Sequence, residues 1–212
     1  DFGYSLKIPK DALEAAKSFE NVTVLDSGHL SSSMGLAVLY AASMAENHMS
    51  KTEIIKTVKK LRRYISSAFI IDSTHMMCHS GRIPKRIQIL CDTLLLHPII
   101  VLKKSRMVVG SMEMGGFTHV AKRYVRKIFL DARNVDRRIL FITYAGMDEK
   151  MLQYLQDLVR QYCPFERVYL QKASSAIASN CGPGSFGLLF LKKNDISISF
   201  SEASREDMQD GS

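Results

Sequence analysis

The sequence predicts an α/β protein with a mixed β-sheet and flanking helices. Short runs of β-branched and aromatic residues alternate with longer amphipathic segments along the 212 residues. Glycine and proline mark many of the boundaries between these segments, and 46% of the residues are hydrophobic, which is sufficient for a substantial core. Alternation of this kind is typical of a sheet with helices packed against it.

The helices are predicted from apolar spacing and from capping residues. Ser31, Ser32 and Ser33 can cap a helix that runs to about Glu46. Ser50 with Glu53 three residues later forms a capping box for a second helix, whose apolar and basic residues fall on opposite faces. Further helices are expected at residues 9–19, 117–128 and 151–162. A short helical stretch is expected to end at His79, and another helix is expected to begin at Pro84.

Short apolar runs between these helices predict the strands. The first run, Val22 to Leu25, ends at a polar turn, so a loop is expected to open at the carboxyl end of a strand. Further strands are expected at residues 68–71, 99–102, 107–112, 139–143, 168–171 and 186–191. A loop rich in Ser, Ala and Gly is expected before the last of them.

Charge and hydropathy limit the classes of function. No segment approaches the roughly 18 consecutive apolar residues of a transmembrane helix, so no transmembrane segment is expected. The net charge of +8 suits nucleic acid, anionic headgroups or an acidic protein equally. The chain lacks a motif that combines aromatic and basic residues, so we expect no nucleic acid partner. Nucleic-acid binding is kept as a rival interpretation because of the basic charge.

The cysteines and the chain ends indicate the setting of the protein. Cys78, Cys91, Cys163 and Cys181 form no C-x-x-C pair, which predicts reduced thiols in a cytoplasmic protein. Asp1 begins no targeting segment, so the chain is expected to start inside a longer gene product. Residues 201–212 are polar and acidic without periodicity, as in a tail or linker.

Two sets of residues could suggest an enzyme. His75 and His79 are spaced i, i+4, but the glutamate of a zinc-protease motif is absent, and we expect no metal. Asp26 and Ser27 could join a histidine in a hydrolase, yet there is no G-x-S-x-G motif. We therefore expect no catalytic residues, and an enzyme remains a rival interpretation.

Two other segments could bind a ligand. In Ser179 to Gly184, two glycines flank a proline and make a fixed turn, through which backbone N–H groups could approach an anion. A purely structural turn is the alternative. The segment from Leu94 to Leu102 could line a hydrophobic tunnel or form an ordinary core strand.

Taken in order, these segments resemble the DegV family. Leu25-Asp26-Ser27, with Ser31, Ser33 and Gly35 after it, resembles the family's strand–DS–turn–helix segment. Ser80 to Ile83 resembles its GGRI turn, Leu94 to Leu102 its LLxxKPIL segment, and Ser179 to Gly184 its THxGPG loop. The resemblance covers roughly residues 21–191 and indicates the carboxy-terminal portion of a DegV, EDD-fold protein.

The resemblance implies a fatty-acid carrier without a cofactor. Family members bury one long-chain fatty acid between two domains, and some present it to a separate fatty-acid kinase subunit, which phosphorylates the carboxylate. An upstream DegV amino-terminal domain would then complete the protein. We expect residues 1–20 to be a linker or the end of that domain, residues 21–192 the lipid-binding domain, and residues 193–212 a tail.

The resemblance also implies the site. Ser179, Asn180, Gly182 and Gly184 are expected near the carboxylate, with Arg82 at the mouth and Ser27 as a further ligand-binding residue. Asn180 stands where the family has histidine, so an ionisable ring is replaced by a neutral amide.

Two further departures concern the headgroup and the handover to a kinase. The family's TSQPS-type and SGTY-type motifs are absent because the chain starts too late, so the headgroup ligands of the first domain cannot be named from this sequence. No arginine of the family's VRxxxK segment is found between Val109 and Lys122, where Glu113 and Gly115-Gly116 stand instead. Asn180 and the missing arginine both favour the alternative function, a regulatory or structural module that kept the fold and lost kinase handover.

Overall fold

The computed structural model describes residues 10–196, which form two compact units. The larger unit takes in residues 66–193, and the smaller takes in residues 10–65 and 194–196 of the described chain. The expected tail from residue 201 lies outside the described residues. The division into two compact units does not test the domain boundaries expected from the sequence, which stay a prediction.

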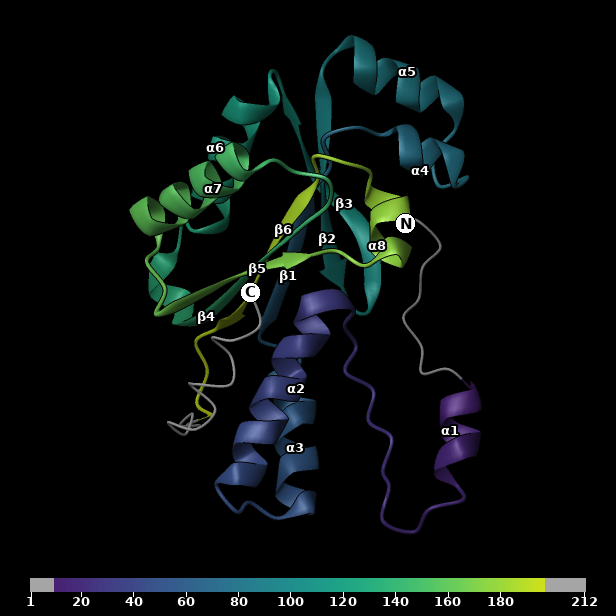
Figure 1. The fold of residues 1–212 in the computed structure, drawn as a ribbon, viewed down its shortest axis with the longest axis vertical. Coiled ribbons are helices and arrows are strands. Elements are labelled where there is room, and N and C mark those ends of the chain that lie inside the picture. Colours follow the sequence, from purple (N-terminus) through teal and green to yellow (C-terminus); the bar gives the residue numbers. More distant parts are fainter. Residues whose placement is uncertain (1–9, 197–212) are drawn as a thin grey trace. The chain divides into compact units, whose positions relative to one another are not determined.

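The smaller unit is helical. It contains α1 (Lys10–Ala16), α2 (Ser31–Glu46) and α3 (Lys51–Leu61), and α2 and α3 lie side by side (Figure 1). The predicted capping box is confirmed: the Ser50 side chain accepts from the Glu53 N–H, and the Glu53 carboxylate accepts from the Ser50 N–H.

Two predictions for this unit are wrong. The β-branched run from Val22 to Leu25 forms no strand, because no strand pairs with it among the described residues. The serines do not cap α2, whose N-cap is Leu30; the Ser33 hydroxyl instead donates to the Leu30 carbonyl at 2.7 Å.

The larger unit is built on a six-stranded mixed sheet, as the sequence predicts. Its strands follow the order β3-β2-β1-β6-β4-β5. The β4–β5 pair is parallel, whereas β1–β2, β2–β3 and β4–β6 are antiparallel. The strands are β1 (Ile65–Ile70), β2 (Leu96–Lys103), β3 (Arg106–Met114), β4 (Val135–Tyr144), β5 (Arg167–Lys172) and β6 (Phe186–Lys192).

Helices flank this sheet. Two of them, α6 (Phe117–Ile128) and α7 (Glu149–Tyr162), cover one face with Val120, Tyr124 and Leu155. Burial raises the pKa of Tyr124, whose hydroxyl donates to the Ala68 carbonyl at 2.7 Å. The segment expected to be a loop before β6 instead contains a helix, α8 (Ser175–Cys181).

On the opposite face, the loops and short helices build a second, smaller core. Met77 of α4 (His75–His79) packs with Ile71 and Ile100, and Met107 and Cys181 lie against them. Figure 1 shows α4 and α8 on this side of the sheet, away from α6 and α7.

The helix α5 (Lys85–Thr93) is turned with its polar side inward. Gln88 is buried and bonds to His75 and Asp92, while Ile87 and Leu90 are exposed. Cys91 is the other buried side chain of α5, and the contact of Gln88 with His75 joins α5 to α4.

In residues 10–196, every helix is too short or too polar to cross a lipid bilayer.

Candidate ligand site

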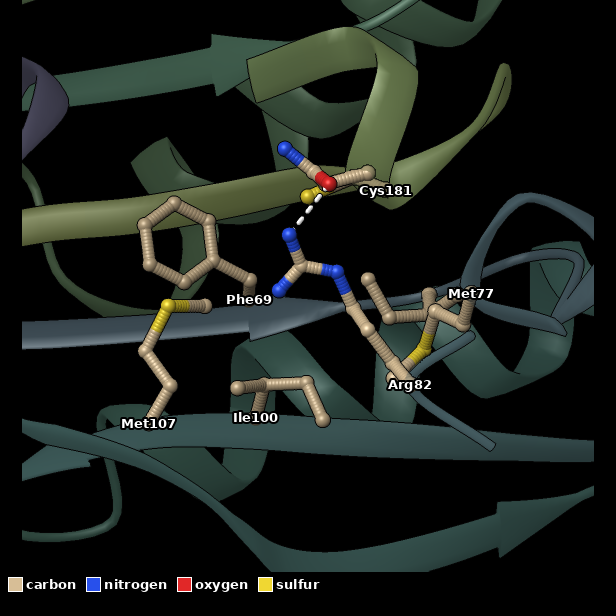
Figure 2. Close-up of a pocket in the computed structure, with 8 residues that line it drawn as sticks. Phe69, Met77, Arg82, Ile100, Met107 and Cys181 are labelled. Atoms are coloured by element: carbon tan, nitrogen blue, oxygen red, sulfur yellow. Dashed lines mark hydrogen bonds between the residues drawn. The ribbon is translucent and has the colours of Figure 1, made fainter. Parts of the chain in front are cut away.

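A small pocket lies on the α4 and α8 side of the sheet, within the larger unit (Figure 2). Its apolar wall consists of side chains from the sheet and from α4: Phe69, Ile71, Met77, Ile100 and Met107. Its other side is formed by Arg82, Asn180 and Cys181. The pocket is therefore amphipathic, with hydrocarbon on one side and a guanidinium group on the other.

Arg82 extends over the apolar wall toward α8. Its Nη2 donates to the Asn180 Oδ1, and its Nε donates to the Ser80 Oγ at 3.2 Å. Figure 2 shows the Arg82 guanidinium beside Phe69, with Met107 and Ile100 below it. Because two fixed side-chain oxygens orient the guanidinium, it can act as a preorganised donor to an anion in the pocket.

Asn180 joins α8 to this arginine. Its Nδ2 donates to the Ala176 carbonyl one turn earlier in α8. The amide thus directs its oxygen at Arg82, and its role in this structure is to accept from the guanidinium. An amide carries no charge at any physiological pH, so this contact does not titrate.

Cys181 adds a thiol to the polar side. Burial raises the pKa of Cys181, although the nearby Arg82 charge opposes that effect. A raised pKa keeps the group as a thiol, which is a poor nucleophile. Cys78, Cys91, Cys163 and Cys181 are all free thiols, and burial also raises the pKa of Cys91 and Cys163.

The turn after α8 is held by the chain itself. The Gly182 N–H donates to the Ala178 carbonyl at 2.8 Å, and the Gly184 N–H donates to the Ala145 carbonyl at 2.7 Å. Both amides therefore have protein acceptors in this structure and are not directed at the pocket. The glycines contribute backbone conformation, since both have positive φ values.

Asp72 supports this turn from the end of β1. A Cβ atom placed on Gly184 would lie 2.5 Å from the Asp72 Oδ2. The Asp72 N–H donates to the Ser185 Oγ at 3.3 Å, and that hydroxyl donates to the Cys181 carbonyl at 2.8 Å. Burial raises the pKa of Asp72, and the charge of His97 opposes the increase.

Within the larger unit, the structure places the predicted site residues in three groups. Arg82 and Asn180 meet at the pocket. Gly182 and Gly184 form the turn behind it. Ser179 is exposed on α8, where its hydroxyl donates to the Ala176 carbonyl at 3.2 Å. Their roles in binding stay predictions.

Ser27 belongs to the smaller unit. Its Oγ lies 3.2 Å from both the N–H and the carbonyl oxygen of His29. The Gly28 N–H donates to the Asp26 Oδ1 at 2.8 Å, so the segment is a tight polar turn. Arg62 at the end of α3 donates to the Asp26 carbonyl at 3.1 Å and fastens this turn to the helix.

His29 makes this turn sensitive to pH. Burial lowers the pKa of His29 from 6.5, and the ring Nε2 lies 2.8 Å from the Arg62 carbonyl. A lowered pKa means that the folded state binds fewer protons than the unfolded state, so stability is lost as the pH falls below about 6.5.

We expect His29→Gln to lose less stability than the wild type between pH 7.5 and 5.5 in urea unfolding. The exposed control His48→Asn should match the wild type, and equal losses in all three proteins would contradict this assignment.

Sequence patterns missed much of the pocket wall. In the segment suggested to line a tunnel, Ile100 faces the pocket, whereas Leu94 and Leu95 are exposed. Phe69 and Ile71 were detectable in principle, because the two-residue period of a strand puts both on one face. Met107 could not be placed in the wall from the sequence, because its position there depends on the pairing of β3 with β2.

Of the two histidines considered for a metal, His75 has other contacts. The His75 Nε2 lies 3.1 Å from the Asp92 Oδ2 and 2.9 Å from the Gln88 Nε2. Within the described part of the chain, no three His, Cys, Asp or Glu side chains gather as a metal site would require.

The chain resembles proteins of the DegV family. The family model described as "Uncharacterised protein, DegV family" matches residues 8–193. A DegV domain-containing protein of Caldanaerobacter subterraneus is 25% identical over 81% of this chain and 61% of the relative. One from Staphylococcus aureus is 22% identical over 82% of this chain and 61% of the relative. The chain thus spans less than two thirds of these relatives.

Solved structures give the same result. A DegV family protein from Thermus thermophilus, described for its fatty acid binding, aligns with a TM-score of 0.70 at 26% identity, over 86% of this chain and 65% of that one. The Fatty Acid Kinase (Fak) B3 protein of Streptococcus pneumoniae, loaded with linoleic acid, shares the fold with a TM-score of 0.71 at 13% identity, over 87% and 64%. Since the family model matches most of its length, the chain belongs to the DegV family.

Proposed function

We propose that the protein binds a long-chain fatty acid, with the carboxylate at Arg82 and the first part of the acyl chain on the apolar wall of the pocket. The observation that carries the proposal is the guanidinium of Arg82, which Asn180 holds over hydrocarbon side chains. The fatty acid binding of the Thermus thermophilus relative supports the same ligand class.

The energetics suit an amphipathic anion. Each methylene removed from water contributes about 0.8 kcal/mol, so an acyl chain supplies most of the affinity. A guanidinium–carboxylate contact then fixes which end of the ligand enters. Part of the total is offset by ordering of the flexible chain.

The pocket must open to take up an acyl chain. Its volume is about 30 Å³, enough for about two water molecules. Met77 and Met107 are the adaptable side chains in its wall, because methionine changes rotamer at low energetic cost. We infer that these two side chains move when a ligand binds.

Replacing Arg82 tests where the carboxylate binds. We expect Arg82→Met to weaken binding of a fluorescent fatty acid about 30-fold, since a hydrogen bond to a charged group contributes about 2 kcal/mol. Arg86→Met is the matched control: it removes the same charge from an exposed position on α5 and should bind like the wild type. Equal affinity of both variants and the wild type would exclude a carboxylate at Arg82.

Bound lipid can be identified directly. Native mass spectrometry of the purified protein, with solvent extraction, should show a mass excess that matches a fatty acid. The same measurement on the protein extended by its upstream coding sequence asks whether a DegV amino-terminal domain completes the site. Absence of lipid from both forms would refute the proposal.

Handover to a separate kinase subunit is the finer form of this proposal. The fold shared with the Streptococcus pneumoniae Fak B3 protein supports it. The alternative is a module that binds lipid without handover, and one observation on β3 favours it. Glu113 stands in the segment where the family has an arginine, and its carboxylate is held by Arg123 at 3.0 Å and by Lys127 at 3.4 Å. ATP consumption by a fatty-acid kinase subunit distinguishes these alternatives. It should rise when this protein is added if handover occurs, and stay unchanged if the protein only binds lipid.

A further inference from the structure

A second cavity lies next to the ligand pocket, within the larger unit. Its volume is about 10 Å³, and its lining comes from β1, from the ends of β4 and β6 that lie near α8, and from α8 itself. Phe69 and Cys181 line both this cavity and the ligand pocket. The two cavities are therefore neighbours, and these two side chains stand between them.

The helix α8 contributes to both cavities. Ile177 lines the second cavity, Asn180 lines the ligand pocket, and Cys181 lines both. None of the seven residues of α8 is buried, and most of them are small. Protein interiors are normally packed as densely as organic crystals, so two unfilled cavities under one helix mark a place where packing is incomplete. The space between α8 and the sheet is therefore available to a ligand.

The lining of the second cavity suits hydrocarbon. Its residues carry no charge and are mostly apolar, among them Ala145, Ala173, Ile177 and Phe186. The Ser185 hydroxyl, which also lines it, already donates to the Cys181 carbonyl at 2.8 Å. The guanidinium of Arg82 belongs to the ligand pocket alone. An amphipathic anion that filled both cavities would therefore place its carboxylate at Arg82 and its methyl end toward Ile177.

Phe69 is the larger of the two side chains between the cavities. It comes from β1 and is 6% exposed. Its ring lies against Gly187 of β6, where an added Cβ atom would be 2.4 Å from the Phe69 Cδ1. The ring thus occupies space that a side chain at position 187 would need. The size of the side chain at position 69 therefore sets the width of the passage between the cavities.

We propose that the acyl chain continues from the ligand pocket past Phe69 into the second cavity, and that Phe69 sets the affinity for long chains relative to short ones. This inference rests on the proposed function and adds the path of the chain to it. A short chain ends before Phe69, whereas the last methylenes of a longer chain pass between the Phe69 ring and Cys181. Because the second cavity holds only about 10 Å³, α8 moves outward to admit them.

Photo-cross-linking locates the end of the chain directly. A palmitic acid that carries a diazirine near its methyl end is bound and irradiated, and the labelled residues are found by mass spectrometry after proteolysis. We expect the label in residues 143–145 and 173–177, and excess palmitate should remove it. Label elsewhere, for example at Met77 or Met107, would overturn the path and leave the proposed function standing. No label that palmitate displaces would refute the proposed function and this inference with it.

Ala173→Leu tests the second cavity, which Ala173 lines and the ligand pocket does not share. We expect its affinity for palmitate to fall about tenfold, as when one to two methylenes lose their burial. Its affinity for octanoate, whose chain ends before Phe69, should not change. Ala176→Leu is the matched control: it makes the same change at an exposed position of α8 and should follow the wild type for both ligands. Equal ratios of palmitate to octanoate affinity in the three proteins would overturn the proposal.

Phe69→Leu tests the passage and should act in the opposite direction. A smaller side chain widens the passage, so palmitate affinity should rise about fourfold relative to octanoate affinity, the contribution of one more buried methylene. Ile71→Val shortens a side chain that lines the ligand pocket alone, and it should change both affinities by the same factor. Adding Ala173→Leu to Phe69→Leu should abolish the gain. A ratio in Phe69→Leu no higher than in the wild type, or a gain that survives Ala173→Leu, would contradict the role of Phe69.

Discussion

Gly187→Ala is expected to destabilise the larger unit by about 3 kcal/mol, as for overpacking in a rigid core. Gly187 lies in β6, where a Cβ atom would come within 2.4 Å of the Phe69 Cδ1 and 2.9 Å of the Ala68 carbonyl oxygen. The ring could move, but the backbone oxygen belongs to the neighbouring strand β1. Urea unfolding of the variant, followed by circular dichroism, measures the loss.

The same substitution should impair the pocket, because Phe69 forms part of its wall. Gly35→Ala is the matched control: a Cβ there meets nothing within 4 Å, and Gly35 lies in α2, where alanine is the better helix former. We expect Gly35→Ala to leave stability unchanged or raise it by up to about 1 kcal/mol. Equal effects of the two variants would contradict the steric explanation.

Gly184→Ala is expected to lower stability by about 3 kcal/mol, from two causes. The φ value of +79° costs a residue with a Cβ atom about 1 to 2 kcal/mol, and that Cβ would lie 2.5 Å from the Asp72 Oδ2. Because the turn carries Asn180 and Cys181 on its amino-terminal side, fatty-acid binding should fall together with stability.

A second glycine separates the two causes. Gly81 has a φ of +72°, yet a Cβ there meets nothing within 4 Å, so Gly81→Ala reports the conformational cost alone. Adding Asp72→Ala to Gly184→Ala should recover the steric part of the loss. If Gly81→Ala and Gly184→Ala lose equal stability, the contact between Asp72 and the turn has no energetic weight.

The sequence was sufficient for elements that depend on local pattern. Strands β1 to β6 and helices α6 and α7 follow from hydrophobic periodicity, and the cap of α3 follows from Ser50 and Glu53. The run at residues 22–25 has the same β-branched composition but no partner strand among the described residues. Pairing is a property of the whole sheet, and composition does not report it.

The sequence indicated part of the polar side of the pocket and little of its apolar wall. The motifs brought Arg82 and Asn180 forward, and the two side chains do meet. From the sequence, the turn could either offer its amides to an anion or be purely structural, and in the structure both glycine amides bind carbonyls of the chain. The acceptor of the Gly182 N–H is local, but that of the Gly184 N–H is Ala145, more than 30 residues away, and no local pattern encodes that contact.

The position of β6 has a consequence for how the protein is made. This last strand of the sheet lies between β1 and β4, in the middle of the strand order. Until residues 186–192 leave the ribosome, β1 and β4 each present an open edge, and the nascent chain holds two partial sheets that cannot join. Contacts between β1 and β6 span over 100 residues, and such distant pairings form slowly. The larger unit should therefore fold only after its synthesis is complete, with a period in which both edges need protection from aggregation.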